Sequence, residues 1–232
     1  MIDWLVDVHL KFKLVPETLY LTVNLIDRYL SMETVSKEKL QLVGVTCMLI
    51  ASKYEEIYAP IVNDFVYITD NAYTKSEILR MERKIISTLN FDLQITSSFR
   101  FVERFAWVLE AEPLFLNLSK YFLELALLDY SMVATKPSLL AASALYLALK
   151  MAKVNTNWIE PLLENCNHPE ADVRVCAKQL FLLFTKAKTS SLQAVRKKVS
   201  MPKFGEVAKI QVDSNNAQPK DNNTAAPTVQ NE

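Results

Sequence analysis

The stretch KLQLVGVTCMLIASKYEE, from Lys39 to Glu56, decides the fold of this chain. Between Leu40 and Ala51 it is apolar on nearly every side, which predicts a helix buried at the centre of a helical bundle. A second stretch of the same length, KPSLLAASALYLALKMAK, occupies residues 136–153. Each stretch carries one lysine at the same position near its end. The two stretches therefore predict two central helices in one chain.

The two stretches are 97 residues apart, and other features repeat at the same offset, as Pro16 and Pro113 do. A fixed offset of this kind indicates two copies of one helical unit. The alternative is a single irregular helical domain. We expect two tandem five-helix units, a C-terminal extension and a disordered polar tail, at residues 1–92, 97–188, 189–210 and 211–232.

Several helix boundaries can also be read from the sequence. Pro16 and Pro113 suit the first turn of a helix, and the helix from Pro113 is expected to reach about Met132. The segment Thr74-Lys-Ser-Glu77 is a capping box, which predicts a helix start at Thr74.

Composition excludes several functional classes. The chain has 232 residues, half of them hydrophobic, with a formal net charge of zero and only two glycines. Phosphate-binding loops and dinucleotide folds need several glycines, and nucleic-acid binding usually needs a basic surface. The three cysteines and two histidines lack metal-ligand spacing. We expect no metal, no cofactor and no catalytic residue.

Seven segments resemble the cyclin family in order and spacing. In the first unit they are MIDWLVDVH, LYLTVNLIDRYLS, KLQLVGVTCMLIASKYEEIYAP, FVYITDNAYTK and ILRMERKIISTLNFDL. In the second unit, YFLELALLDYSMV and PSLLAASALYLALK look more like mitotic B-type than A-type cyclins. The resemblance covers roughly residues 1–205. The family opening has further residues ahead of Met1, so we expect an N-terminally truncated chain.

The resemblance implies an all-α fold of two tandem five-helix cyclin boxes. It also implies a non-catalytic regulatory subunit that binds and activates a cyclin-dependent protein kinase at the G2/M transition. A nuclear and cytoplasmic location is expected. A second hypothesis is a cyclin-fold, DNA-binding transcription factor of the transcription factor IIB type, but that family is basic and carries an N-terminal zinc ribbon. This chain shows neither feature.

Lys53 and Glu82 are the first candidate functional residues. Glu82 shares a helix face with Ile78 and Ile85, and a carboxylate in an apolar stripe is costly unless it is paired. The 97-residue offset places neutral Gln179 at the matching site, so the fold itself does not require this charge. The resemblance implies that Lys53 and Glu82 hydrogen-bond the kinase. The alternative is an internal ion pair that only stabilises the first unit.

Apolar residues near this pair are candidates for the rest of a kinase-binding surface, although core packing is the simpler reading of any one of them. These candidates are Leu42, Ile50, Tyr54, Ile57, Ile86 and Phe91.

A second candidate surface surrounds Trp4, which lies on the flank of the first helix rather than on its core stripe. The resemblance implies a shallow groove that holds basic-x-Leu motifs of substrate or inhibitor peptides. Asp7 would attract the basic residue. The alternative is a tryptophan buried between the two units. The full predicted patch is Met1, Trp4, Asp7, Leu40 and Gln41.

The segment 186–203 contains six basic residues and no acid. We expect a solvated helix end followed by a flexible basic strand. A phosphate-binding or nucleic-acid-binding role is the alternative.

Overall fold

The computed structural model describes residues 1–152, 154 and 157–210, and these residues form helices without any β-strand. The expected all-α fold is confirmed, whereas the predicted disordered tail lies outside the described residues. The α-helices are α1 (Ile2–Phe12), α2 (Pro16–Met32), α3 (Leu40–Glu55), α4 (Val62–Ile68), α5 (Lys75–Thr88), α6 (Ser98–Val108), α7 (Pro113–Ala126), α8 (Pro137–Met151), α9 (Ile159–Cys166), α10 (Glu170–Lys186) and α11 (Ala194–Val199). Short 3₁₀ turns are η1 (Lys37–Lys39), η2 (Tyr130–Met132), η3 (Pro202–Phe204) and η4 (Val207–Lys209).

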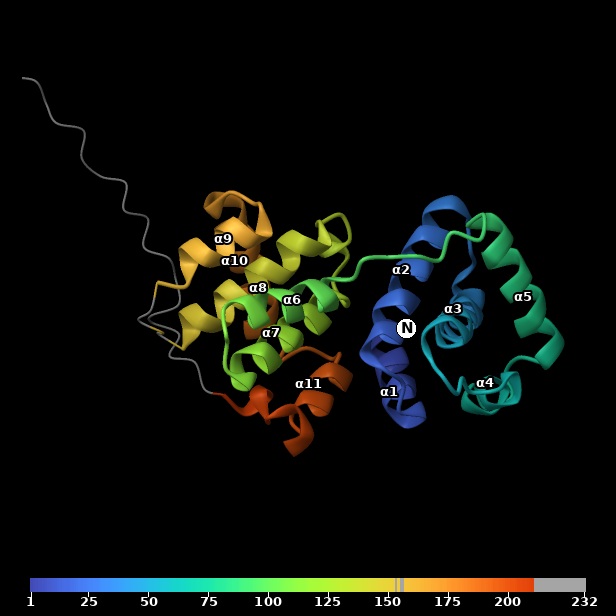
Figure 1. Ribbon diagram of the computed structural model, residues 1–232. Coiled ribbons are helices and arrows are strands. Elements are labelled where there is room, and N and C mark those ends of the chain that lie inside the picture. The colour runs from blue at the N-terminus through green and yellow to red at the C-terminus, as the bar shows by residue number, and fades with distance from the viewer. Residues whose placement is uncertain (153, 155–156, 211–232) are drawn as a thin grey trace, which may run out of the picture.

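Figure 1 shows two helical bundles side by side, α1–α5 and α6–α10, which we call the first and second box. Each is built around its most apolar helix. Every residue of α3 from Leu42 to Ser52 is buried, as is every residue of α8 from Leu140 to Leu149. The two apolar stretches are therefore the central helices, because only a fully enclosed helix can be apolar on all sides at low cost.

The boxes repeat in backbone detail. Helices α3 and α8 begin 97 residues apart, at Leu40 and Pro137. Lys13 and Glu110, which end α1 and α6, share the same offset and the same left-handed conformation, with φ of 55° and 48°. In both cases the next residue donates a backbone hydrogen bond back to the helix end, from Leu14 to His9 and from Ala111 to Ala106.

One expected boundary is wrong. Helix α7 ends at Ala126 rather than near Met132, and the 3₁₀ turn η2 follows it. The side chain of Asp129 accepts a hydrogen bond from the backbone N–H of Ser131. Such local side-chain bonds compete with helix propagation. The capping box at Thr74 is confirmed, since Glu77 accepts from the Thr74 backbone while Thr74 accepts from the Glu77 backbone.

The C-terminal segment folds back between the boxes. Helix α11 lies against α1 (Figure 1), and the Ala194 backbone N–H donates to Asp3 Oδ1 at 3.0 Å. Lys198 is only 3 % exposed and pairs with Glu124 of α7 at 2.6 Å. The expectation of a flexible, solvated basic strand is therefore wrong. Ala194, Val195 and Val199, which flank the three consecutive basic residues, give α11 an apolar face, and this face is buried.

Candidate functional site

Lys53 and Glu82 meet across the surface of the first box. Lys53 stands in the last turn of α3, where the buried helix emerges into solvent, and Glu82 stands in the middle of α5. Lys53 Nζ donates to Glu82 Oε1 at 2.7 Å. The Glu82 side chain is 12 % exposed and the Lys53 side chain 46 %. Helix α5 packs on α3 and buries Ile78 and Ile85, and this packing places Glu82 next to Lys53.

The lysine of this pair is accessible to solvent, whereas Glu82 is mostly buried. An ammonium group has three N–H donors, and Glu82 uses one of those on Lys53. The remaining donors of the half-exposed Lys53 can be offered to a partner. Exposed ion pairs contribute little to folding, about 0–1 kcal/mol. The geometry is therefore compatible with both hypotheses. The ion pair forms within the first box, as the structural hypothesis requires, and Lys53 still presents charge to solvent, as the binding hypothesis requires.

Two of the expected surface residues are not on the surface. Leu42 is 6 % exposed and Ile50 is 2 % exposed, and both belong to the core of the first box. They lie on α3, which is enclosed over this whole stretch, so the simpler reading as core residues is correct for them. Ile86 is partly buried against the same core.

The other three expected residues are exposed. Tyr54 is 53 % exposed, Ile57 is 91 % exposed and Phe91 is 75 % exposed. Phe91 also has φ of 60°, which is unusual for a bulky side chain and marks a locally constrained turn. Large apolar side chains that remain in water at these fractions favour an interaction surface.

Sequence reasoning missed two neighbouring residues. Tyr58 is 92 % exposed and Ile61 is 63 % exposed, and both lie in the connection from α3 to α4. The available signal was the Ala59-Pro60 break, because a segment that forms no helix has no helical face with which to bury its apolar residues.

Glu56, at the start of the connection from α3 to α4, has a structural role. Glu56 Oε1 accepts the Val15 backbone N–H at 2.8 Å and the Thr18 hydroxyl. Val15 immediately precedes α2, so the carboxylate satisfies the otherwise unpaired start of that helix. Glu56 thus ties the end of α3 to the start of α2 and holds the exposed segment in place.

The predicted peptide-docking residues come from the starts of α1 and α3. A side chain at Gly44 would lie 3.1 Å from both Met1 Sδ and Leu5 Cδ1, so this glycine lets α1 approach α3 closely. Trp4 is partly buried against the core of the first box, while Asp7 is exposed. Trp4 is therefore not buried between the boxes. Leu40 and Gln41 are partly buried in the first turn of α3.

The matching surface of the second box lacks these features. Lys150 and Gln179 stand where the first box has Lys53 and Glu82, and both are exposed. Lys150 instead lies over the ring of Tyr146, 5.8 Å from its centroid. Residues 153, 155 and 156, which follow α8, lie outside the described part. The charged pair therefore distinguishes the first box from its repeat.

The described residues contain no group of three or more histidine, cysteine or acidic side chains placed to hold a metal ion. Likewise, none of the described helices is long and apolar enough to span a membrane.

Comparison with known proteins identifies the family. The family model "Cyclin, N-terminal domain" matches residues 1–94, and "Cyclin, C-terminal domain" matches residues 96–213. The G2/mitotic-specific cyclin-B of Patella vulgata is 45 % identical over 94 % of this chain and 53 % of its own length. Cyclin-B2-2 of Arabidopsis thaliana is 43 % identical over 90 % of this chain and 48 % of its own length. Cyclin-A1-4 of Oryza sativa subsp. japonica is 45 % identical over 90 % of this chain.

Solved structures agree on the fold. A viral cyclin from herpesvirus saimiri superposes with a TM-score of 0.72 at 20 % identity, covering 80 % of this chain and 82 % of its own. The CAK complex of Chaetomium thermophilum bound to ATP-γ-S contains a chain that matches with a TM-score of 0.63 at 16 % identity, covering 93 % of this chain and 72 % of its own.

The repeat, the helical boxes and these matches together place the chain in the cyclin family. Similar relatives include several B-type cyclins, as the sequence motifs indicated, and also an A-type cyclin. The chain spans about half the length of the first curated relatives that it matches.

Proposed function

We propose that this chain is the regulatory subunit of a cyclin-dependent protein kinase that acts at the G2/M transition, and that it has no catalytic role itself. The supporting observation is the Lys53–Glu82 pair, whose lysine is solvent-accessible and which lies on the box with exposed apolar residues. The similar relatives named G2/mitotic-specific cyclin-B support the timing.

The mechanism follows from what a protein kinase requires. Phosphoryl transfer needs a lysine–glutamate pair inside the kinase, and this pair forms only when the glutamate-bearing helix is correctly placed. A subunit that binds this helix better in its active position shifts the kinase toward the active state. Exposed apolar residues of the first box would supply contact area, and Lys53 with Glu82 would supply the polar bonds that fix the orientation.

The experiment measures binding and folding of the same variants. Lys53→Ala and Glu82→Gln each remove one polar partner, and a polar group of the kinase is then left buried without a bond. That loss costs about 2–5 kcal/mol, or roughly 30-fold to several thousand-fold in Kd. Purified chain is mixed with a panel of cyclin-dependent kinases, and Kd, histone phosphorylation and the unfolding midpoint of the free chain are recorded.

The repeat supplies a matched control. Lys150→Ala removes the equivalent lysine of the second box, and it should change kinase affinity less than twofold. If the first-box variants lower the unfolding midpoint but leave Kd and kinase activation unchanged, the pair is only structural and the proposal fails.

We also propose that Met1, Trp4, Asp7, Leu40 and Gln41 recruit substrates with basic-x-Leu motifs. Exposed Asp7 beside partly buried apolar residues suits a basic residue followed by a leucine. Trp4→Ala should slow phosphorylation of substrates that bear the motif and spare short peptides that lack it. An equal loss for both substrate types would make Trp4 a structural residue. A nuclear and cytoplasmic location fits this role and can be checked by imaging a tagged chain.

A further inference from the structure

Trp107 lies on the outer face of α6, away from the core of the second box. Helix α6 buries its opposite side, which carries Ser98, Phe99, Val102, Phe105 and Ala106. Arg100, Glu103, Arg104 and Trp107 recur at the spacing of one outward helix face. Trp107 is the only apolar residue of these four, and it is 81 % exposed. The core therefore does not need this side chain, and tryptophan is enriched among residues that dominate binding energy.

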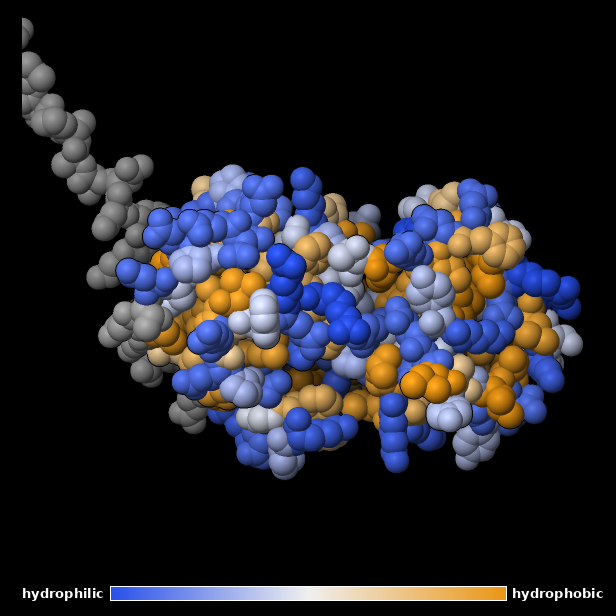
Figure 2. Space-filling model, in the orientation of Figure 1, coloured by the Kyte–Doolittle hydropathy of each residue, from blue (hydrophilic) through white to orange (hydrophobic). Residues whose placement is uncertain are grey.

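A groove of about 630 Å³ runs beside Trp107 at the turn from α6 to α7. This volume lies within the range of roughly 300–1,000 Å³ that is typical of binding sites. Figure 2 shows apolar patches bordered by hydrophilic residues on the near face of the second box, where Figure 1 places α6 and α7. Besides Trp107, the groove is lined by apolar and acidic residues, namely Glu103, Ala106, Val108, Glu110, Ala111 and Leu116.

The charge around the groove is acidic. Residues 101–119 contain three acids and a single base. Glu103 is already engaged, since it accepts hydrogen bonds from Arg100 at 3.2 Å and from Lys120 at 3.0 Å. Glu110, in contrast, has no ion-pair partner among the described residues. Its exposed carboxylate is therefore available to a cation from outside the chain.

An acid at the position of Glu110 is unusual. Glu110 follows the last turn of α6 with φ of 48°, a left-handed conformation that residues other than glycine seldom adopt. The C-terminal end of a helix carries partial negative charge, so this position favours a cation. The first box follows that rule, because Lys13 occupies the matching position after α1. The fold thus does not require an acid here, and a bound cation would compensate both Glu110 and the helix end.

We propose that this groove docks a basic, apolar segment of a protein partner. One lysine or arginine side chain of the segment lies over the indole of Trp107, because cations bind favourably to the face of a tryptophan ring. The charge of that side chain lies next to Glu110, and a neighbouring apolar side chain enters the groove. The unpaired carboxylate and the aromatic face both select for a cation, whereas a phosphate or another anion is repelled by Glu110.

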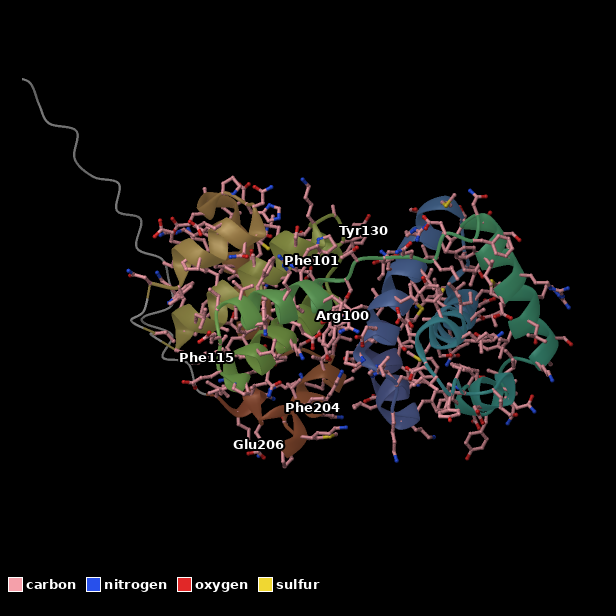
Figure 3. All side chains as sticks on the ribbon, viewed as in Figure 1. Arg100, Phe101, Phe115, Tyr130, Phe204 and Glu206 are labelled. Atoms are coloured by element: carbon pink, nitrogen blue, oxygen red, sulfur yellow. The ribbon has the colours of Figure 1, made fainter. Side chains whose placement is uncertain are left out.

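This surface is separate from the two surfaces proposed above. Figure 3 shows Arg100, in the first turn of α6, beside the first box, and Phe115, in the first turn of α7, on the side of the second box away from the first. The turn between α6 and α7 therefore lies on the second box, whereas Trp4 and Lys53 lie on the first. Docking at Trp107 does not depend on the binding of a kinase or of a basic-x-Leu motif.

The three tryptophans of the chain allow a test that resolves the site. The indole N–H signals of Trp4, Trp107 and Trp158 are followed by NMR on the nitrogen-15-labelled full chain while a peptide is added. Each signal is assigned by replacing its tryptophan with phenylalanine. The probe is the peptide GLRLRG, which contains no basic-x-Leu motif, and GLQLQG is its neutral match. GLRLRG should shift the Trp107 signal with a Kd at least about tenfold lower than that of GLQLQG, and the signal of buried Trp158 should stay in place.

Charge reversal at a single position gives the decisive variant. Glu110→Lys introduces the residue type that Lys13 provides after α1, so the fold should tolerate it, and it should weaken binding of GLRLRG at least about tenfold. Glu110→Gln removes the charge without reversing it and is measured alongside. Glu164→Lys, at an exposed acid in the last turn of α9, should change binding less than twofold.

Three results would overturn the proposal. They are no shift of the Trp107 signal with GLRLRG, equal affinity for the two peptides, and unchanged affinity in the Glu110 variants. A shift of the Trp4 signal in place of the Trp107 signal also contradicts it, because the peptide has then bound to the first box. The unfolding midpoint of each variant is recorded, so that loss of folding is not mistaken for loss of binding.

Discussion

Two ion pairs show how differently the two boxes use the same chemistry. Lys53–Glu82 and Lys198–Glu124 have nearly equal lengths, 2.7 and 2.6 Å. The first leaves its lysine 46 % exposed, whereas both side chains of the second are at most 9 % exposed. A buried pair must be complete, because breaking it leaves a charge without water or partner. An exposed pair is free to exchange partners. Burial, rather than distance, therefore separates a structural ion pair from one available for binding.

The ends of the central helices support the same distinction. Helices α3 and α8 both end in a lysine-bearing turn. Among the described residues, only Lys53 of these two lysines forms an ion pair, with Glu82 of α5, and Gln179 of α10 stands at the matching position of the repeat. The two boxes share one helical arrangement, although the first has the Lys53–Glu82 pair and the second has Lys150 and Gln179 at the matching positions. The first box therefore carries a feature that helix packing does not need.

The largest expected effect is on the buried pair. Lys198→Met should lower the free energy of unfolding by about 3–5 kcal/mol, because Glu124 loses its only ion-pair partner in a desolvated site. Chemical denaturation of the free chain measures it. The double variant Lys198→Met/Glu124→Leu should recover most of the loss. If the single variant is as stable as the wild type, the pair does not hold the C-terminal segment against α7.

The next effect concerns His9, which is buried on α1 close to α11. Desolvation, and then the nearby charge of Lys198, lower its pKa from 6.5 to about 4. The unfolded chain therefore binds a proton more readily between these values, and stability should fall as pH drops from 6.5 to 4. The loss amounts to at most about 3 kcal/mol. His9→Gln should flatten this part of the stability–pH curve, and an unchanged slope would contradict the assignment.

A smaller effect of opposite sign is expected for the free chain at Asp27. Desolvation raises the pKa of this carboxyl group, which means that the folded state takes up the proton first, so the contribution to stability is present below pH 3.8 and is lost as pH rises through about 6. Asp27→Asn should stabilise the chain by about 1 kcal/mol at pH 7.5, after allowance for partial exposure, and by almost nothing at pH 3.5. Thermal melts at the two pH values test this. Destabilisation at pH 7.5 would indicate a cation partner already in place.

The smallest effect distinguishes the exposed pair from the buried one. Lys53→Ala should change the free energy of unfolding by less than about 1 kcal/mol, since Lys53 is half exposed. Denaturation of the free chain in parallel with Lys198→Met gives the comparison directly. A loss as large as that of Lys198→Met would make Lys53–Glu82 a structural pair as well.

Much of the fold could be predicted because it depends on local pattern. The apolar stretches set the central helices, and prolines and the Thr74 capping box set helix starts. The end of α7 could not be predicted in this way, because the Asp129–Ser131 hydrogen bonds compete with the helix at little local cost. Among the candidate site residues, Tyr54, Ile57 and Phe91 proved to be exposed, whereas Leu42 and Ile50 proved to be core residues. All six apolar candidates are hydrophobic in sequence, and only packing separates them.

The sequence by itself determined the number of boxes and their central helices, and it identified the charge at Glu82 as unusual. These features follow from apolar periodicity and from the 97-residue repeat, which are both local patterns of the chain. Only the tertiary structure decided which charges meet. Lys198 lies 74 residues from Glu124, and Ala194 lies 191 residues from Asp3. Contacts at such separations depend on how whole helices pack. The local sequence of the basic segment 186–203 does not indicate whether its lysines are solvated or buried.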